Sequence, residues 1–430
     1  MKNAALLSLN RNAVASAPAA VVVSGAAGQR PYVRRLSPIE RCSLVLNAVH
    51  RYNLDAVVDG HGHIDPQDLQ AAVQRAAEAN PAIRVRLRGV LGFCRWVDSG
   101  VPPLISVVSD SAWDGKSSDH AGFMTGRLDP VQGGPVSDIF LVSCRDGHQR
   151  VVFRAVHAAV DGRAMLHWMQ EVFRALRGEE LLGSRSTLTD WDIQKKLQKQ
   201  VTDTAPPLGA CLPVVAPGAA PGPVEYLWRR IVIDHNVSHP LAKAAVFLAN
   251  WARRQGEGEV GFTIPVDYRG LRTTEMGMGN LTGFVQMSVA GDEKPRAVMQ
   301  HLNQRIRDLA DCRMQPVALV PWLPLTLLVK MFLARLDALL YSVGKGIPTA
   351  GIVSMGVVRA KDFACAGFEP DYVYGIPGAV GKLNVVFVNY GDVTIVSFAA
   401  PKAYNHAGQL DEMIAAFRQH FSSPAQPATP

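Results

Sequence analysis

The stretch Val156-His157-Ala158-Ala159-Val160-Asp161-Gly162 decides how this chain is interpreted. Residues 151–156, which lead into it, are an apolar run that predicts a β-strand. After it, apolar side chains recur at steps of three and four, which predicts an amphipathic helix through Met165, Leu166, Met169, Val172, Phe173 and Leu176. His157 is therefore expected at the end of a strand, where α/β proteins commonly bind ligands. We interpret it as a candidate catalytic base, because imidazole accepts a proton near neutral pH.

The composition of the 430 residues is that of a globular protein with room for two sizeable cores. Hydrophobic residues make up 48% and charged residues 19%, which excludes a disordered chain. The net charge of +7 is spread thinly, and neither a block of Lys and Arg nor a recognisable module indicates nucleic-acid binding. A phosphate-bearing cofactor or an acidic carrier protein fits this charge.

The six cysteines are far apart and form no CxxC pair: Cys42, Cys94, Cys144, Cys211, Cys312 and Cys365. This spacing predicts free thiols in a reducing compartment, so we expect a cytoplasmic protein without a structural zinc site.

Two segments resemble targeting or membrane sequences. Residues 1–30 are rich in Ala, Val and Ser, but Arg11 interrupts any apolar core, so we expect a flexible leader; a signal peptide is the alternative. Residues 316–336 are the longest apolar stretch, and the interruptions by Pro and charged residues, such as Pro324 and Lys330, argue against a spanning helix. We expect a buried helix pair there, with peripheral membrane contact as the alternative.

Alternating strand and helix patterns divide the chain into two α/β halves. The first covers residues 31–202, the second covers residues 225–424, and a Pro-, Ala- and Gly-rich linker covers residues 203–224. Within the first half, Ser37 and Asp65 are expected to cap helices, and Asp146-Gly147 predicts a hairpin turn.

The central stretch resembles the HxxxDG signature of the chloramphenicol-acetyltransferase-like superfamily. That superfamily includes BAHD acyltransferases, wax-ester synthases, polyketide-associated acyltransferases and the condensation domains of peptide synthetases. Further segments, spread over nearly the whole chain, resemble condensation-type chains and fall in the same order: Leu36-Ser37-Pro38-Ile39-Glu40; Asp59-Gly60-His61-Gly62-His63-Ile64-Asp65 followed by Asn80-Pro81-Ala82-Ile83-Arg84; and Pro265-Val266-Asp267-Tyr268-Arg269 followed by Gly279-Asn280.

The sequence also departs from these relatives. Condensation domains and wax-ester synthases usually carry two adjacent histidines, and Val156 stands in the first position here. The DFGWG segment of BAHD enzymes is only echoed by residues 362–368. The resemblance therefore indicates the superfamily rather than one of its branches.

The resemblance implies two acetyltransferase-like subdomains, mixed sheets flanked by helices, with an active-site tunnel between them. It implies an acyltransferase that moves an acyl group from a thioester, on coenzyme A or on a carrier protein, to a hydroxyl or amine acceptor in natural-product or lipid biosynthesis. His157 is the expected general base. The protein is expected to be a monomer and to hold no permanently bound cofactor. Asp161 is expected to turn away from the imidazole and pair with Arg269.

Three further residues are candidates for support of the site. Gly162 is expected to allow a tight turn into the helix. Ser354 and Asn280 are candidates for contact with the oxyanion of the tetrahedral intermediate or with the substrate, although an ordinary strand serine and a structural asparagine explain them as well.

Two other functions remain open. A condensation-like module that recruits a carrier protein without catalysis would have the same fold, but its histidine would be free to vary. His61-Gly62-His63 resembles the first metal ligands of amidohydrolase barrels; such a site needs later histidines and an aspartate that the sequence does not supply in the right places. We therefore expect no metal at the active site.

Overall fold

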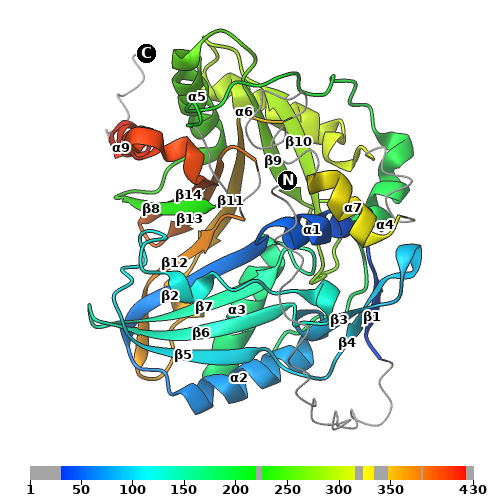
Figure 1. The fold of residues 1–430 in the computed structure, drawn as a ribbon, viewed down its shortest axis with the longest axis vertical. Helices are drawn as coiled ribbons and strands as arrows, with labels where there is room; N and C mark the ends of the chain where they lie inside the picture. The colour runs from blue at the N-terminus through cyan, green and yellow to red at the C-terminus, as the bar shows by residue number, and fades with distance from the viewer. Residues whose placement is uncertain (1–30, 219–224, 315–322, 334–346, 379–380, 423–430) are drawn as a thin grey trace, which may run out of the picture. The chain divides into compact units, whose positions relative to one another are not determined.

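The computed structural model describes residues 31–218, 225–314, 323–333, 347–378 and 381–422. Two large sheets and one small sheet are built from these residues, and helices pack against the large ones (Figure 1).

The first large sheet has the strand order β12-β2-β7-β6-β5. Its strands are β2 (Asn53–Gly62), β5 (Leu104–Ser111), β6 (Ser137–Cys144), β7 (His148–Val156) and β12 (Phe368–Ile376). β5 and β6 are parallel and the other neighbours antiparallel. Helices α2 (Pro66–Ala79) and α3 (Gly162–Leu176) pack against each other, and α3 also contacts β2 and β7. The helix that follows the HxxxDG stretch is thereby fixed to the sheet that carries His157.

The second large sheet has the order β10-β9-β11-β13-β14-β8. Its strands are β8 (Tyr226–Ile233), β9 (Gly261–Asp267), β10 (Thr282–Ser288), β11 (Ala350–Val358), β13 (Asn384–Tyr390) and β14 (Val393–Pro401). β11 runs parallel to both of its neighbours and the other pairs are antiparallel. The helices that contact this sheet are α5 (Pro240–Ala252), α6 (Pro295–Arg307) and α9 (Gln409–Ser422). The expected fold class, two α/β subdomains with mixed sheets flanked by helices, is confirmed.

The remaining elements include a small antiparallel sheet in the order β1-β4-β3. Its strands are β1 (Val33–Arg35), β3 (Val85–Arg88) and β4 (Arg95–Asp98), and the remaining α-helices are α1 (Pro38–Val49), α4 (Asp190–Leu197) and α7 (Leu325–Leu333). Helix starts follow the sequence signals: Ser37 and Glu40 form a capping box on α1, and Asp65 caps α2. Gly147, with φ +83°, makes the β6–β7 hairpin turn.

Strand β12 crosses from the second half of the sequence into the first sheet. It pairs antiparallel with β2 and forms that sheet's edge, whereas the sequence analysis predicts no strand there. Glu369, Pro370 and Asp371 hide the apolar alternation, and an edge strand tolerates proline because one of its sides needs no donor. The strand expected at residues 83–87 is present as β3 but begins at Val85, because residues 81–84 form a 3₁₀ helix. Helix α4 was not predicted.

The described part of the Pro-rich segment, residues 203–218, is held against the second half of the chain. Arg305 Nη2 donates to Asp203 Oδ2 at 3.1 Å, Lys382 Nζ to the Cys211 carbonyl at 2.7 Å, and Gly218 N to the Ala403 carbonyl at 2.8 Å. The rest of the predicted linker, residues 219–224, lies outside the described residues.

The apolar stretch 316–336 is described only in part, as residues 323–333. Helix α7 contacts α1, and Leu327, Met331 and Leu333 are exposed. Among the described residues, none of the helices combines the length and the apolar character needed to cross a bilayer.

Candidate active site

The backbone of His157 is held on both sides as it leaves β7. Its N–H donates to the Tyr52 carbonyl at 3.2 Å, and its carbonyl accepts from Asn280 Nδ2 at 2.7 Å. Val156, the last residue of β7, pairs with Asn53 of β2, and its N–H donates to the Val136 carbonyl at 2.8 Å. The imidazole is therefore mounted on a fixed stretch of backbone at the end of a central strand.

The imidazole ring itself lies against a tyrosine. The rings of His157 and Tyr52 stack with centroids 4.9 Å apart and planes 25° apart. Burial lowers the pKa of His157 below its ordinary value, and backbone groups of His157 and Val160, Asp161 and Asn280 offset this only in part. The ring is therefore neutral at neutral pH, and its Nδ1 is buried without a hydrogen-bond partner among the described residues.

Asp161 is saturated by donors and makes no hydrogen bond to His157. Its Oδ1 accepts from Ala164 N at 2.9 Å, which caps α3. Its Oδ2 accepts from Arg269 Nη1 at 3.0 Å, Leu281 N at 2.8 Å and Thr282 Oγ1 at 3.0 Å. Burial alone would raise the pKa of this carboxyl, but Arg269 and the backbone donors outweigh it and hold the pKa below its usual range. The contact between Asp161 and Arg269 is the one the sequence analysis expects, and it joins α3 to the loop after β9.

Each nitrogen of the Arg269 guanidinium donates a further hydrogen bond besides the one to Asp161. Nε and Nη2 donate to the Gly277 carbonyl at 2.8 and 2.7 Å, Nη2 also donates to the Gly279 carbonyl at 2.9 Å, and Nη1 contacts Asp267 Oδ1 at 2.7 Å. Together with the contact to Asp161, these bonds use all five N–H donors of the guanidinium. The loop that carries Asn280 is thereby fixed by the same arginine that balances Asp161.

A second buried ion pair lies beneath the HxxxDG loop and was missed by the sequence analysis. Arg34 and Glu40 pair with both side chains fully buried, and Arg34 Nη2 donates to the Ala159 carbonyl at 3.1 Å. Asn280 N donates to Glu40 Oε1 at 3.5 Å. A Cβ on Gly279 would lie 2.7 Å from Arg34 Nη1, so only glycine fits beside this pair. The sequence showed Glu40 only as a capping residue and offered no sign that Arg34 is buried.

Two other buried polar groups near this network were not predicted. Burial, and then Glu40, raise the pKa of Asp190 to about 7. Both polar atoms of the Asn53 amide are buried without a hydrogen-bond partner among the described residues. Unpaired buried amides are uncommon, so Asn53 is a candidate for contact with a substrate or a water molecule.

The explanation given for Gly162 is wrong. Its φ is not in the left-handed region, and a Cβ there would meet no atom within 4 Å. The turn into α3 therefore does not require glycine. What Gly162 provides is open space at the first residue of the helix.

Ser354 and Asn280 are placed differently from each other. Ser354 is exposed on β11 at a register irregularity, its hydroxyl accepts from Gly356 N at 3.3 Å, and no contact with His157 is found among the described residues. Asn280 is buried and spends its side-chain donor on the His157 carbonyl. The geometry of Asn280 is that of a support for His157.

His61 and His63 do not form a ligand pair. His61 Nδ1 lies 2.5 Å from Asp371 Oδ2, whereas His63 Nδ1 lies 3.4 Å from Gln149 Nε2. Glycines at 60 and 62 allow β12 to approach, because a Cβ on either would lie within 2.2 Å of a β12-side carbonyl oxygen. The glycine–histidine alternation is thus explained by strand packing.

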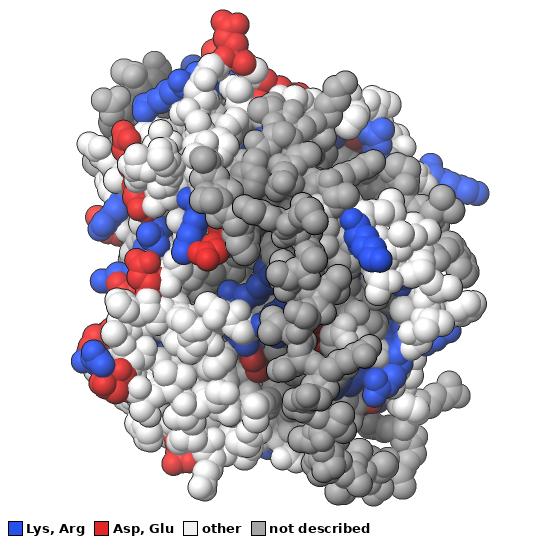
Figure 2. All heavy atoms as spheres, viewed as in Figure 1, with Lys and Arg blue, Asp and Glu red and all other residues white. Residues whose placement is uncertain are grey.

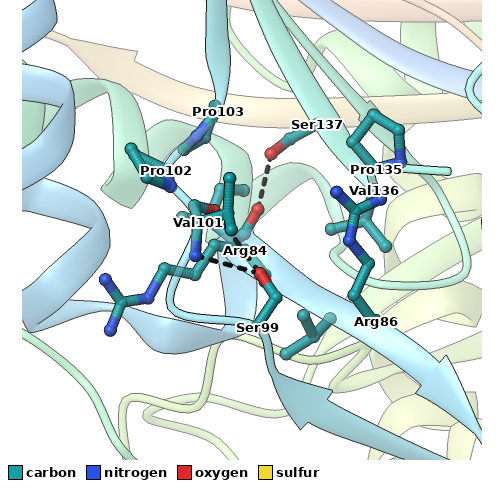
Figure 3. A pocket seen from close by; sticks show the side chains of 11 residues that line it. Arg84, Arg86, Ser99, Val101, Pro102, Pro103, Pro135, Val136 and Ser137 are labelled. Carbon is teal, nitrogen blue, oxygen red and sulfur yellow. Dashed lines mark hydrogen bonds between the residues drawn. The ribbon is translucent and has the colours of Figure 1, made fainter. Parts of the chain in front are cut away.

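Neither of two hollows on the described part of the chain is lined by His157. One, of about 200 Å³, is lined by residues that include Arg84, Ser99, Pro102 and Ser137, and the hydroxyls of Ser99 and Ser137 donate to backbone carbonyls there (Figure 3). The other, of about 400 Å³, lies on the outer side of α3 and is lined by His167, Gln170, Glu171, Arg174, Arg177, Leu182, Arg359 and Asp362. The expected tunnel at His157 stays a prediction.

Charges on the visible face are mixed. Figure 2 shows Lys and Arg interspersed with Asp and Glu, without a large patch of one sign. This distribution agrees with the thin spread of charge along the sequence.

Comparisons with known structures define the class of fold. The starter condensation domain of rhizomide synthetase, a mutant in complex with C8-CoA, has a TM-score of 0.65 and 14% identity, over 93% of this chain and 96% of that one. The first condensation domain of the calcium-dependent antibiotic synthetase, with a substrate analogue, has a TM-score of 0.62 and 15% identity, over 92% and 98%. The epimerization domain from the third module of tyrocidine synthetase B has a TM-score of 0.55 and 13% identity, over 92% and 98%.

The chain therefore has the condensation-domain fold over nearly its whole length. No model of a protein family and no curated protein sequence matches it. Since the epimerization domain shares the fold, the fold alone does not define the reaction.

Proposed function

We propose that the protein is an acyltransferase that moves an acyl group from a thioester to a hydroxyl or amine acceptor, with His157 as general base. The observation that carries this proposal is how His157 is held. Its imidazole is half-buried and neutral at the end of β7, and its backbone is hydrogen-bonded on both sides. The nearby Asp161 carboxylate is already occupied by Arg269 and other donors. The condensation-domain fold supports the reaction class, because domains with this fold were solved with C8-CoA and with other substrate analogues.

The proposed reaction needs one base and no acyl-enzyme. Nε2 of His157 takes the proton of the acceptor as its oxygen or nitrogen attacks the thioester carbonyl. The tetrahedral intermediate then collapses, the C–S bond breaks, and the leaving thiolate takes the proton from the imidazolium. A positioned base of this kind contributes about 10²–10⁴-fold to rate. Asp161 does not act as a triad partner in this scheme, because its oxygens are occupied by Arg269, Leu281, Thr282 and Ala164.

The donor is a thioester of coenzyme A or of a carrier protein's phosphopantetheine arm. The net charge of +7 suits either, since both are anionic. The open space at Gly162, five residues after His157 and at the start of α3, suits the approach of a thin pantetheine chain. The rhizomide synthetase domain was solved with C8-CoA and Leu-SNAC together, which supports an amine acceptor as one of the two acceptor kinds.

The favoured acyl donor carries a long or apolar acyl group. Leu327, Met331 and Leu333 of α7 leave apolar surface exposed beside α1. We place the reaction in the cytoplasm, since all six cysteines are free. Equal turnover of acetyl and long-chain donors would remove the support for an apolar cargo.

The test is the full chain with a panel of acyl-CoA and pantetheine thioesters and candidate alcohols and amines, with products identified by mass spectrometry. His157→Ala should lower the rate at least about 100-fold with the fold intact by circular dichroism. His235→Ala is the matched control, because His235 is an exposed histidine away from the site. His157→Gln serves as a second variant if alanine destabilises the loop.

Two outcomes overturn parts of the proposal. Transfer at the wild-type rate in His157→Ala would show that the base is misassigned. Absence of transfer by the wild type over the whole panel, with retained binding of a carrier protein, would favour a non-catalytic recruiting module.

A further inference from the structure

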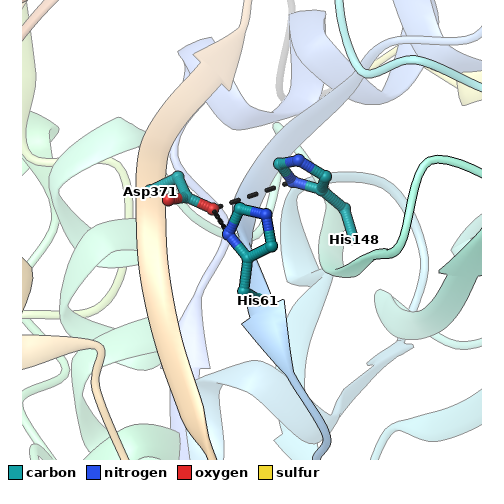
Figure 4. A group of neighbouring side chains, drawn as sticks. All are labelled: His61, His148 and Asp371. Atoms are coloured by element: carbon teal, nitrogen blue, oxygen red, sulfur yellow. Dashed lines mark ion pairs between the residues drawn. The ribbon is translucent and has the colours of Figure 1, made fainter.

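Two histidines and an aspartate from three neighbouring strands converge at the opposite end of β2 and β7 from His157. His61, the last residue but one of β2, pairs directly with His148, the first residue of β7. Asp371 projects from β12 toward both histidines (Figure 4). Val156 pairs with Asn53 at one end of these strands and His148 with His61 at the other. At about 3.4 Å per residue the eight-residue separation is about 27 Å, so this cluster is separate from the His157 site.

The donor atoms of the cluster are close enough to share one ion. Asp371 Oδ2 lies 2.5 Å from His61 Nδ1 and 3.7 Å from His148 Nδ1, and one donor atom from each of the three residues lies within 4.8 Å of the other two. The two imidazole rings are 4.2 Å apart. Tetrahedral zinc, with bonds of about 2.0–2.1 Å, holds its ligand atoms about 3.4 Å apart, which rotation of these side chains can reach.

Asp371 is presented to the histidines by a strand irregularity. The β12–β2 register shifts between Pro370 and Tyr372, so Asp371 is the extra residue of a β-bulge. Bulges redirect a side chain at the edge of a sheet. Oδ2 of Asp371 is shielded from solvent and meets no donor in hydrogen-bond geometry among the described residues, although His61 Nδ1 is 2.5 Å away. A cation held between the three residues would give this oxygen a partner.

A buried carboxylate supports the second histidine. His148 Nδ1 lies 2.9 Å from Asp59 Oδ1, and Asp59 is in turn held by Arg150 Nε at 3.0 Å. A carboxylate on one nitrogen of a ligating histidine orients the ring and leaves the other nitrogen for the metal, so with Nδ1 held by Asp59 the ligand atom of His148 would be Nε2. Two imidazoles, one carboxylate and a nearby second carboxylate form a donor set that suits zinc.

We propose that His61, His148 and Asp371 bind a divalent transition-metal ion of the zinc type. The ion would join β12, which comes from the second half of the sequence, to β2 and β7 of the first. Its position on three strands, with His61 exposed to 61% in its side chain, indicates a structural or regulatory clamp with a fourth position open to solvent or to another ligand. The site is independent of the proposed acyl transfer.

The test is titration of the full chain, freed of metal by a chelator, with Zn²⁺ in a calorimeter. We expect one equivalent at this site and a loss of affinity of at least about 100-fold in His61→Ala and Asp371→Ala, since loss of an outer partner alone typically costs about 10–100-fold. His63→Ala is the matched control and should keep the wild-type affinity within about twofold, because His63 contacts Gln149 instead. His61 and Asp371 lie on the surface, so these variants should fold.

Two further readouts separate this site from the free thiols. Bound Co²⁺ should give the visible spectrum of nitrogen and oxygen ligands without a thiolate charge-transfer band. Zn²⁺ should raise the melting temperature and slow hydrogen exchange of residues 368–376 in wild type but not in His61→Ala. Absence of saturable binding in wild type, unchanged affinity in His61→Ala, or an equal loss in His63→Ala would each overturn the proposal.

Discussion

Strands β2 and β7 run side by side between two sites, one at His157 and one at His61 and His148, that differ in how their carboxylates are hydrogen-bonded. At the His157 end, Asp161 accepts from four donors, and its side chain and that of Arg269 are exposed only to 4% and 6%. At the other end, Asp371 is 35% exposed and lies between two imidazoles without a well-aligned donor.

The two ends therefore differ in whether their carboxylate can still bind another group: Asp161 cannot, and Asp371 can. Where both oxygens of Asp161 are already occupied, this carboxylate has no free acceptor, and the proposed base is the imidazole of His157. At the other end, the Asp371 carboxylate has no aligned donor and lies beside two imidazoles, so the three side chains together can accept a cation. The same pair of strands thus carries a candidate base at one end and a candidate ligand set at the other.

The largest expected effect is the loss of stability when the buried ion pair between Arg269 and Asp161, at the His157 end, is broken. Arg269→Ala leaves Asp161 charged, buried and short of its partner, which should lower the free energy of unfolding by about 3–5 kcal/mol. Urea unfolding followed by circular dichroism measures it. Arg145→Ala removes the exposed pair with Asp110 beside the opposite end of β7 and should leave stability unchanged. An unchanged midpoint for Arg269→Ala would show that the buried pair does not hold the loop.

The next effect is on the hydrogen bond that fixes the His157 backbone. Asn280→Ala leaves the His157 carbonyl without its 2.7 Å donor, which should cost about 1–3 kcal/mol of stability and lower kcat/KM through misplacement of the ring. Asn236→Ala removes a similar bond, 2.8 Å to the Gly391 carbonyl, from an exposed site and should cost less than about 0.5 kcal/mol. Equal losses in the two variants would contradict a special role for Asn280.

The pH dependence of transfer should follow the lowered pKa of His157. Because burial disfavours the imidazolium, the ring stays neutral at pH 7, and kcat/KM should be flat there and fall only as pH drops below the ordinary value of about 6.5. One pH unit below the folded-state pKa the rate should be about tenfold lower. The unfolded chain takes up this proton more readily, so His157 also makes the fold less stable as pH falls below about 6.5. If kcat/KM already began to fall above pH 6.5, or if NMR showed His157 titrating above that value, the lowered pKa of His157 would be contradicted.

Much of the fold could be predicted because its signals are local. The apolar run of β7, the stripe of α3 and the caps Ser37 and Asp65 each depend on a few adjacent residues, and each lies where the sequence places it. The pairing of Asp161 with Arg269 was expected from family resemblance, since nothing local links residues so far apart. The structure brings them to 3.0 Å.

The features that were missed depend on long-range packing. Strand β12 carries Glu369, Pro370 and Asp371 near its start, and only its pairing with β2 shows that it belongs to the first sheet. Arg34 is buried because Glu40 and the Ala159 carbonyl meet it, and a sequence scan expects an arginine to be exposed. The His61–His148–Asp371 cluster needs three strands and a bulge, so the sequence offered only His61-Gly62-His63, of which His63 takes no part.

The smallest expected effect is the difference in stability between alanine variants of two glycines, Gly147 before β7 and Gly162 after it. Gly147 has φ +83° in the hairpin, and replacing it with alanine should cost about 1 kcal/mol through backbone strain. Gly162 has no such constraint, and a Cβ added there would meet no atom within 4 Å, so Gly162→Ala should leave the free energy of unfolding unchanged or raise it by as much as about 1 kcal/mol. If the space at Gly162 admits the thioester arm, the same variant should nevertheless raise KM for the donor. A destabilised Gly162→Ala would restore the tight-turn explanation, whereas a stable variant with unchanged KM would place the donor elsewhere.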